Sequence, residues 1–336
     1  MTIVRKNPET VIPAEAGIQL NKGQSKRIKY PSASVRIRPY PFFLTLGLFI
    51  LLAVRFTLAA EVAVLQSAKL EAFNQVVGGF RENFPQAAVF YLPEGGADQE
   101  AVLEQLRERN PAVILAVGGP AAAVLKERFK NVSIVYCMIS DPRRFNLSGA
   151  NVAGVVLKIR TQDQFQLFKK AFPTLSRIGL IYDPAVSGEV VAEARTLAKG
   201  FGFLLVERLI NKPGEIADAV KDIIWEVDAL WMIPDSTVVS KESFQYLLES
   251  SIEKKIPLLV FSEGFVKSGA LLALAPDYPV IGRQAGSLVQ KIIEGQSPGA
   301  IPPVYSQGAV AINLHTAKTL GISISPEVMK MTGRIY

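Results

Sequence analysis

The sequence predicts an α/β protein of two similar lobes, each a parallel sheet flanked by helices, joined by a hinge of three chain crossings. Three observations predict this fold. Short apolar runs alternate with segments of helical period, two successive sets of four runs share one spacing, and three further strand-like segments lie outside those sets. Continuous apolar runs indicate strands buried on both faces of a parallel sheet. The alternation with helices is that of successive β-α-β units.

The first set of apolar runs begins 20 to 25 residues apart. The runs are Val62–Leu65, Ala87–Leu92, Ala112–Val117 and Val132–Met138. Asp98–Arg109 and Ala121–Phe129, which lie between runs, have helical period. In the first of these helices, Val102, Leu103 and Leu106 share the face that would pack on the sheet.

The second set repeats this rhythm, with starts about 25 residues apart. Its runs are Ile178–Tyr182, Phe203–Val206, Ala229–Ile233 and Pro257–Phe261. The helices predicted between these strands are Glu189–Lys199, Glu215–Trp225 and Lys241–Glu253. Two sets of matching spacing predict two lobes of similar construction.

Three strand-like segments join the two sets, namely Asn151–Leu157, Ala270–Ala275 and Val310–Asn313, and the helix Ile281–Ile293 follows the second. They predict that the chain passes between the lobes three times, which permits closure over a ligand. The first lobe would comprise residues 61–158 and 276–305, and the second lobe residues 159–275 and 306–336.

Residues 1–60 predict a secretory leader. Basic residues up to Arg38 precede the apolar run Phe42–Val54, and Arg55 and small residues up to Ala60 follow it. This is the order of a signal peptide, and a membrane span would need about 20 apolar residues. The leader predicts export to the periplasm, with an uncleaved anchor as the alternative. Its long basic stretch also leaves a later start at Val35 open.

The leader carries the whole net charge of +7. It holds nine of the 37 Lys and Arg residues and two of the 30 acids, so residues 61–336 hold 28 of each. A neutral body argues against a nucleic-acid partner. Cys137, a predicted core residue, and His315 are the only residues of their types, so no internal disulfide or Cys/His zinc site is expected. Without a phosphate-loop or dinucleotide glycine motif, the sequence implies no cofactor and no metal.

Ligands of parallel sheets bind beyond the carboxyl ends of the strands, where helix N-termini present free amide groups. The residues at those ends are small, hydroxylic and acidic, so both lobes offer hydrogen-bond partners to one ligand. In the first lobe the candidates are Ser67, Gly119, Pro120, Ala121, Ser140 and Asp141. In the second lobe they are Tyr182, Asp183, Asp235, Ser236, Thr237, Ser262 and Glu263, and Asp277 follows the second joining segment.

Each candidate also has a structural interpretation. The two glycines before Pro120 would let a ligand carboxylate approach helix amides, or they form an ordinary strand-to-helix turn. Aspartates at such positions also serve as helix N-caps or in Asx-turns. Tyr182 would stack on a ligand ring or pack at the edge of the core. Ser67 is not expected to be a nucleophile, because His315 is better interpreted as an exposed or helix-capping residue than as its base.

Segments in a fixed order from Glu61 to about Met331 carry a family resemblance. They are Val62–Ser67, Ile114–Ala121, Ser140–Pro142, Asn151–Val155, Ile178–Pro184, Asp228–Pro234, Gly282–Gly286, Ile312–Leu314, Leu320–Ile322 and Pro326. In order and spacing they resemble the periplasmic substrate-binding proteins of the type I fold, specifically the ABC transporter substrate-binding protein family.

The resemblance implies capture of a small ligand, amino-acid-like or a small carboxylate, for an ABC-type uptake system, and some members bind aromatic amino acids. The implied partners are this ligand and an ABC permease of the inner membrane, and the implied protein is a monomer that is not an enzyme. The chain departs from the family pattern at Gly119, Ser140, Asp183 and Asp235–Thr237, which leaves the ligand open. A periplasmic sensing module that partners a signalling receptor is the alternative function.

Overall fold

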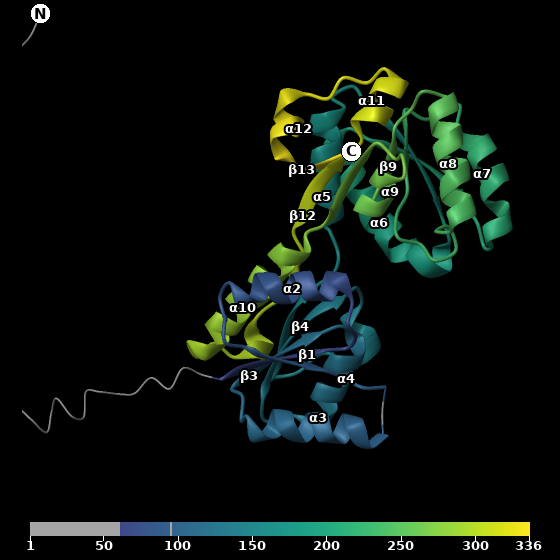
Figure 1. The fold of residues 1–336 in the computed structure, drawn as a ribbon. Coiled ribbons are helices and arrows are strands. Elements are labelled where there is room, and N and C mark those ends of the chain that lie inside the picture. Colours follow the sequence, from purple (N-terminus) through teal and green to yellow (C-terminus); the bar gives the residue numbers. More distant parts are fainter. Residues whose placement is uncertain (1–60, 95) are drawn as a thin grey trace, which may run out of the picture. The chain divides into compact units, whose positions relative to one another are not determined.

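The structure is a computed structural model that describes residues 61–94 and 96–336. The predicted leader, residues 1–60, lies outside the described residues. The described chain forms two mostly parallel β-sheets, sheet A and sheet B, each with helices on both faces (Figure 1). This arrangement confirms the predicted α/β class.

Sheet A has the strand order β11-β5-β4-β3-β1-β2, and every neighbouring pair is parallel. Its strands are β1 Val62–Gln66, β2 Ala88–Tyr91, β3 Val113–Val117, β4 Ser133–Ile139, β5 Val152–Val156 and β11 Val304–Tyr305. The central strands β1 and β3 are buried along their full length. Helices α2 (Glu71–Arg81) and α10 (Tyr278–Ile293) cover one face, and α3 (Gly96–Glu108) and α4 (Gly119–Arg128) cover the other.

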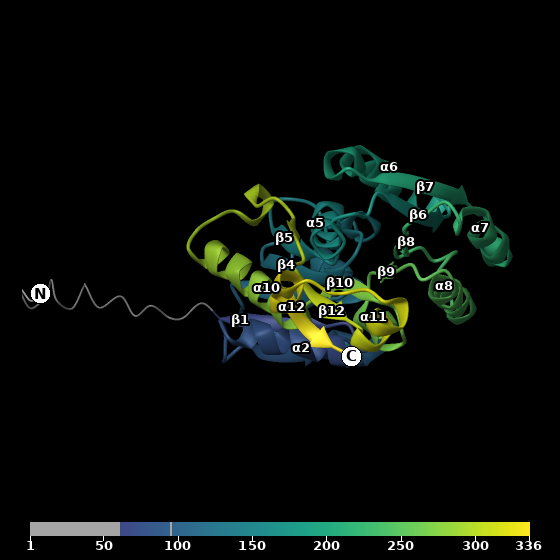
Figure 2. The ribbon, with the colours of Figure 1, turned by 90° about the horizontal axis from the view of Figure 1, so that it is seen from above.

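Sheet B has the order β13-β12-β10-β9-β8-β6-β7, in which only the pair β10–β12 is antiparallel. Its strands are β6 Arg177–Tyr182, β7 Leu204–Leu209, β8 Ala229–Trp231, β9 Leu258–Val260, β10 Leu272–Pro276, β12 Gly308–Ile312 and β13 Thr332–Ile335. One face packs on α5 Thr161–Ala171, α6 Pro184–Phe201, α11 Leu314–Leu320 and α12 Pro326–Met331. The other packs on α7 Ile216–Ile223, α8 Lys241–Glu253 and α9 Glu263–Lys267, with α7 and α8 side by side (Figures 1 and 2).

The chain passes between the two sheets three times, as predicted. It leaves sheet A after β5, returns after β10 to form α10 and β11, and enters sheet B again at β12. The predicted joining segments themselves are interior strands, because β5 lies within sheet A and β10 and β12 lie within sheet B. The crossings are therefore the short segments that follow β5, β10 and β11.

Helices α2 and α10 come from distant parts of the chain and pack against each other on sheet A (Figure 1). Their backbones approach closely at two glycines. A β-carbon on Gly79 would lie 2.0 Å from the Pro279 carbonyl oxygen, and one on Gly282 would lie 2.0 Å from the Val76 carbonyl oxygen. Only glycine leaves room for this crossing.

Two adjacent glycines of α2 give opposite expectations. Gly79→Ala forces the helices apart, so we expect the free energy of unfolding to fall by about 1–3 kcal/mol. Gly78 is exposed, and a β-carbon added there would meet no atom within 4 Å. Gly78→Ala should therefore raise the free energy of unfolding by about 0.5–1 kcal/mol, because alanine has the higher helix propensity. Urea unfolding of both variants measures the difference, and equal effects would contradict the close helix crossing.

Candidate functional site

The predicted residues of the first lobe gather at the carboxyl edge of sheet A. Strands β3 and β1 are parallel neighbours, as are β3 and β4, so their carboxyl ends lie at one edge. The Ser67 amide donates to the Val117 carbonyl at 2.9 Å, and the Gly118 amide donates to the Cys137 carbonyl at 2.9 Å. These bonds bring the ends of the three strands together.

Ser67 caps helix α4 from the neighbouring strand. Its Oγ accepts a hydrogen bond from the Ala121 amide at 2.9 Å, while Pro120 has no amide hydrogen and Gly118 turns the chain with φ 94°. The amides predicted to hold a ligand carboxylate are thus partly engaged by the protein itself. Since a hydroxyl accepts and donates at once, the Ser67 O–H group can still donate to a ligand.

Two phenylalanines that sequence reasoning missed cover this edge. Ring atoms of Phe73, on α2, lie 3.0 Å from where a β-carbon of Gly118 would be, and a ring atom of Phe145 lies 2.2 Å from that of Gly119. The two glycines make room for these rings. Phe73 could not be anticipated at this edge because α2 was not predicted, and Phe145 follows Asp141 in a segment with no regular period.

A bulge in β4 directs the next two candidates. Met138 has φ 60°, and the register with β5 shifts between Tyr136 and Ile139. A left-handed backbone is uncommon for an unbranched, bulky residue and marks a local distortion of the strand. It sets the direction in which Ser140, which is exposed, and Asp141 leave the sheet.

Asp141 caps the short 3-10 helix Pro142–Phe145 and is paired with an arginine. Its Oδ1 accepts hydrogen bonds from the Arg143 amide at 3.1 Å and from Arg143 Nε at 3.0 Å. Arg143 also donates to Glu189 of α6 at 3.2 Å. The hydrogen bond from the Arg143 side chain lowers the pKa of the Asp141 carboxyl. Asp141 is therefore a paired anion.

Three predicted residues of the second lobe form one buried hydrogen-bonded group at the ends of β6 and β8. Asp235, 1% exposed, accepts from the amides of Thr237 at 2.9 Å, Val238 at 3.2 Å and Asp183 at 2.9 Å. Asp183 caps α6 by accepting from the Ala185 amide at 2.9 Å, and it accepts from the Thr237 hydroxyl at 2.7 Å. Both carboxylates therefore tie the two strand ends together. Ser236, between Asp235 and Thr237 on the chain, is exposed.

Tyr182 lies in the core of sheet B, where its ring packs among buried apolar residues. Its hydroxyl donates to Glu207 at 3.0 Å and accepts from Arg195 at 3.2 Å. Hydrogen bonding from Arg195 lowers the pKa of Glu207, so the group stays ionised and holds the tyrosine hydroxyl. Of the two interpretations of Tyr182, packing at the edge of the core describes this environment, and stacking on a ligand ring does not.

The remaining acidic candidates are also engaged within the protein. Asp277 caps α10 by accepting from the Val280 amide at 3.1 Å. Glu263 pairs with Arg334 at 2.7 Å and accepts from the Tyr336 hydroxyl. Asp277 thus lies at a crossing, and Glu263, the first residue of α9, links that helix to β13.

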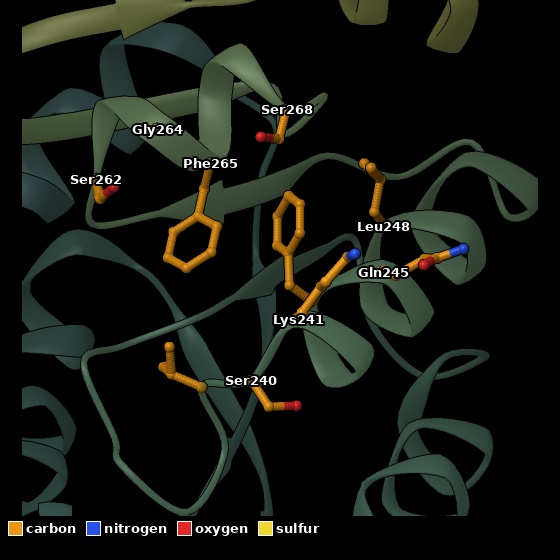
Figure 3. Close-up of a pocket in the computed structure, with 10 residues that line it drawn as sticks. Ser240, Lys241, Gln245, Leu248, Ser262, Gly264, Phe265 and Ser268 are labelled. Atoms are coloured by element: carbon orange, nitrogen blue, oxygen red, sulfur yellow. The ribbon is translucent and has the colours of Figure 1, made fainter.

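Ser262 lines an open cavity of about 740 Å³ between α8 and α9 (Figure 3). Its lining residues come from α8, from α9 and from the segments that precede these helices. Figure 3 shows Ser262 and Phe265 on one side and Lys241 and Leu248 on the other. The rings of Phe265 and Phe244, 4.6 Å apart between centroids, make the cavity largely apolar, a surface suited to a small ring-bearing molecule.

Among the described residues, Ser67 and His315 are not hydrogen-bonded as a nucleophile and its base. His315 is exposed on α11, as predicted, whereas Ser67 bonds to α4. Cys137 is buried in the core, as predicted, and burial raises the pKa of its thiol.

Within residues 61–94 and 96–336, no three His, Cys, Asp or Glu side chains cluster as metal ligands. In the same range, no helix combines the length and apolar character that crossing a membrane requires.

Hydrogen-bonding groups gather at the carboxyl edges of the parallel strands in both sheets, which is where α/β proteins of this kind bind ligands. A family model described as ABC transporter substrate binding protein matches residues 62–335, and the chain belongs to this family. Membership confirms the predicted resemblance. The description of this family names a substrate-binding protein and no enzymatic activity, in agreement with the prediction for this chain.

Two relatives extend the comparison at the level of sequence. A tyrosine-binding protein of Clostridioides difficile is 29% identical over 217 residues, which is 62% of this chain and 62% of that protein. The chain therefore matches less than two thirds of that relative's length. An uncharacterized protein of Rickettsia prowazekii is 26% identical over 264 residues, 76% of this chain and 84% of that protein.

Solved structures with the same fold include two bacterial binding proteins. The ABC domain from Streptococcus pneumoniae in complex with L-Trp has a TM-score of 0.55 and 25% identity. The ligand-free, open structure of a substrate binding protein with adhesive properties from Clostridium difficile has a TM-score of 0.68 and 20% identity. Each match covers 82% of this chain and 99% of the other.

The hydrogen bonds of Asp235 predict a structural role that stability measurements can isolate. Asp235→Ala leaves three amides without their acceptor, so we expect the free energy of unfolding to fall by about 3 kcal/mol or more. Ser236→Ala, at the exposed neighbouring position, should change it by less than about 0.5 kcal/mol. Chemical denaturation followed by circular dichroism measures both. An Asp235→Ala variant as stable as the parent would refute the role.

Proposed function

We propose that the chain is an extracytoplasmic solute-binding protein of an ABC-type uptake system. It captures a small molecule, amino-acid-like or a small carboxylate, by closure of two lobes. The observation that carries the proposal is the family match over residues 62–335. The carboxyl-edge groups of sheets A and B supply the hydrogen-bonding partners that such a ligand requires.

The relatives favour an aromatic amino acid within this class. One is a tyrosine-binding protein, and a solved structure contains L-Trp. The edge of sheet A presents the rings of Phe73 and Phe145 beside the Ser67 hydroxyl. Apolar surface next to a hydroxyl donor suits a ligand that combines a ring with a carboxylate.

The path of the chain supports the proposed closure. We assign sheet A to a lobe of residues 61–158 and 276–305, and sheet B to a lobe of residues 159–275 and 306–336. Three short crossings connect these lobes, and hinges are segments of this kind. A ligand that touches both lobes binds the closed state more tightly and shifts the population toward it.

The proposed location is the periplasm, reached through the leader in residues 1–60, and the proposed partner is an ABC permease of the inner membrane. The protein acts as a monomer that delivers its ligand to that permease. The family to which the chain belongs serves ABC transporters, which supports the transport role over a sensing module.

Ligand binding and closure make a joint prediction. We expect L-tyrosine or L-tryptophan to stabilise the purified chain by about 2.7 kcal/mol at a concentration 100 times the Kd, measured as a shift of the melting temperature. Small-angle X-ray scattering at saturation should show a smaller radius of gyration than without ligand.

D-ribose, which carries hydroxyls without ammonium or carboxylate, serves as the matched control and should leave the melting temperature unchanged. A screen in which amino acids and small carboxylates all fail to shift it would refute the ligand class. Binding with an unchanged radius of gyration would refute closure alone.

A further inference from the structure

Two buried side-chain oxygens stand out within residues 61–94 and 96–336. Gln66 Oε1 and Ser306 Oγ are the only buried side-chain nitrogen or oxygen atoms of this range without a hydrogen-bond partner. A buried polar group without a partner is costly, so each such atom calls for a missing partner, such as a ligand or water. Both residues lie at the carboxyl edge of sheet A, Gln66 at the end of β1 and Ser306 just after β11.

Gln66 lies next to the residues that form the candidate site. Its side chain alternates with Val62 and Val64 and so points to the face covered by α2 and α10. It is 1% exposed, but Ser67 after it is partly exposed, and residues 68–70 that follow are exposed and belong to no helix or strand. Its partner on β3 is Val117, which directly precedes Gly118, and the ring of Phe73 packs against Gly118.

The carboxylates at the strand ends are already engaged. Asp235 accepts from three amides, and Asp183 accepts from an amide and a hydroxyl. Asp141 accepts from Arg143, Asp277 caps α10, and Glu263 accepts from Arg334 and Tyr336. Gln66 Oε1, like Ser306 Oγ, is a buried acceptor at these edges that still lacks a donor, and of the two it is the one that lies beside Ser67.

We propose that Gln66 determines specificity by accepting, through Oε1, a hydrogen bond from the ammonium group of an amino-acid ligand. This inference rests on the proposed function and assigns one contact within it. The neighbouring Ser67 hydroxyl donates to the ligand carboxylate. Gln66 thus binds the ammonium group of the amino acid, and Ser67 binds its carboxylate. A site built around such a bond rejects an analogue that lacks the donor, because the buried acceptor is then left unpaired.

The test compares two ligands on two proteins by isothermal titration calorimetry. The ligands are L-tyrosine and 3-(4-hydroxyphenyl)propionate, which has the same ring and carboxylate but no ammonium group. Gln66→Leu keeps the size of the side chain and removes the acceptor. We expect it to weaken L-tyrosine binding about 10- to 100-fold, the usual effect of losing one hydrogen bond to a charged group. Binding of the propionate should be unchanged.

Ser306→Ala is the matched control, because it removes the other unpartnered buried oxygen. Four strand spacings separate β11 from β1 in sheet A, about 19 Å at 4.7–4.9 Å each, so L-tyrosine affinity should stay the same. Gln66→Glu, which keeps acceptor oxygens, provides a second variant if Gln66→Leu does not fold. We expect it to retain L-tyrosine binding within about threefold.

The outcomes separate this inference from the proposed function. If the parent protein binds L-tyrosine and Gln66→Leu binds it equally well, the partner of Oε1 is a buried water and the inference is wrong, while the proposed function stands. If Gln66→Leu weakens the binding of L-tyrosine and of the propionate equally, the inference is also wrong, because Gln66 then has a structural role. If the parent binds none of the amino acids in the screen, the proposed amino-acid ligand is wrong and this inference is wrong with it.

Discussion

The burial of parallel strands on both faces is the constraint on which the rest of the structure depends. A strand such as β3, with apolar side chains on both faces, needs helices above and below, and parallel neighbours need crossover connections. Every strand of sheet A therefore ends at one edge, and helices such as α4 begin there. This gathers free helix amides, turn residues and strand-end side chains in one place before any ligand is considered.

That gathering has a second consequence. Helix amides at the edge need acceptors, and the residues best suited to supply them are the small hydroxylic and acidic ones that would also bind a polar ligand. In this chain Asp183, Asp235 and Asp277 serve the protein's own amides. The groups that can still bind a ligand are those not used in hydrogen bonds within the protein. In the proposed site they are the hydroxyl hydrogen of Ser67 and the carboxamide oxygen of Gln66.

Much of the fold could be predicted because it rests on local apolar pattern. Helix α8 was predicted with its observed bounds, Lys241–Glu253, since its apolar stripe follows the helical period and Ser240 caps it. Helix α2 was not predicted, because its two glycines weaken the helical signal. One of them, Gly79, is required by the approach of α10, about 200 residues further along the chain, which no local pattern records.

The sequence alone determined the fold class, the two sets of strands and the edges at which polar residues collect, because burial and helical period act between neighbours on the chain. Only the tertiary structure decided which of those residues are engaged. Whether an aspartate caps a helix depends on donors contributed by other strands, as Asp183 and Asp235 show. Likewise the rings over Gly118 and Gly119 come from elements whose packing is set by long-range contacts. The physical reason is that a hydrogen bond is satisfied in space, by whichever donor the folded chain brings within reach.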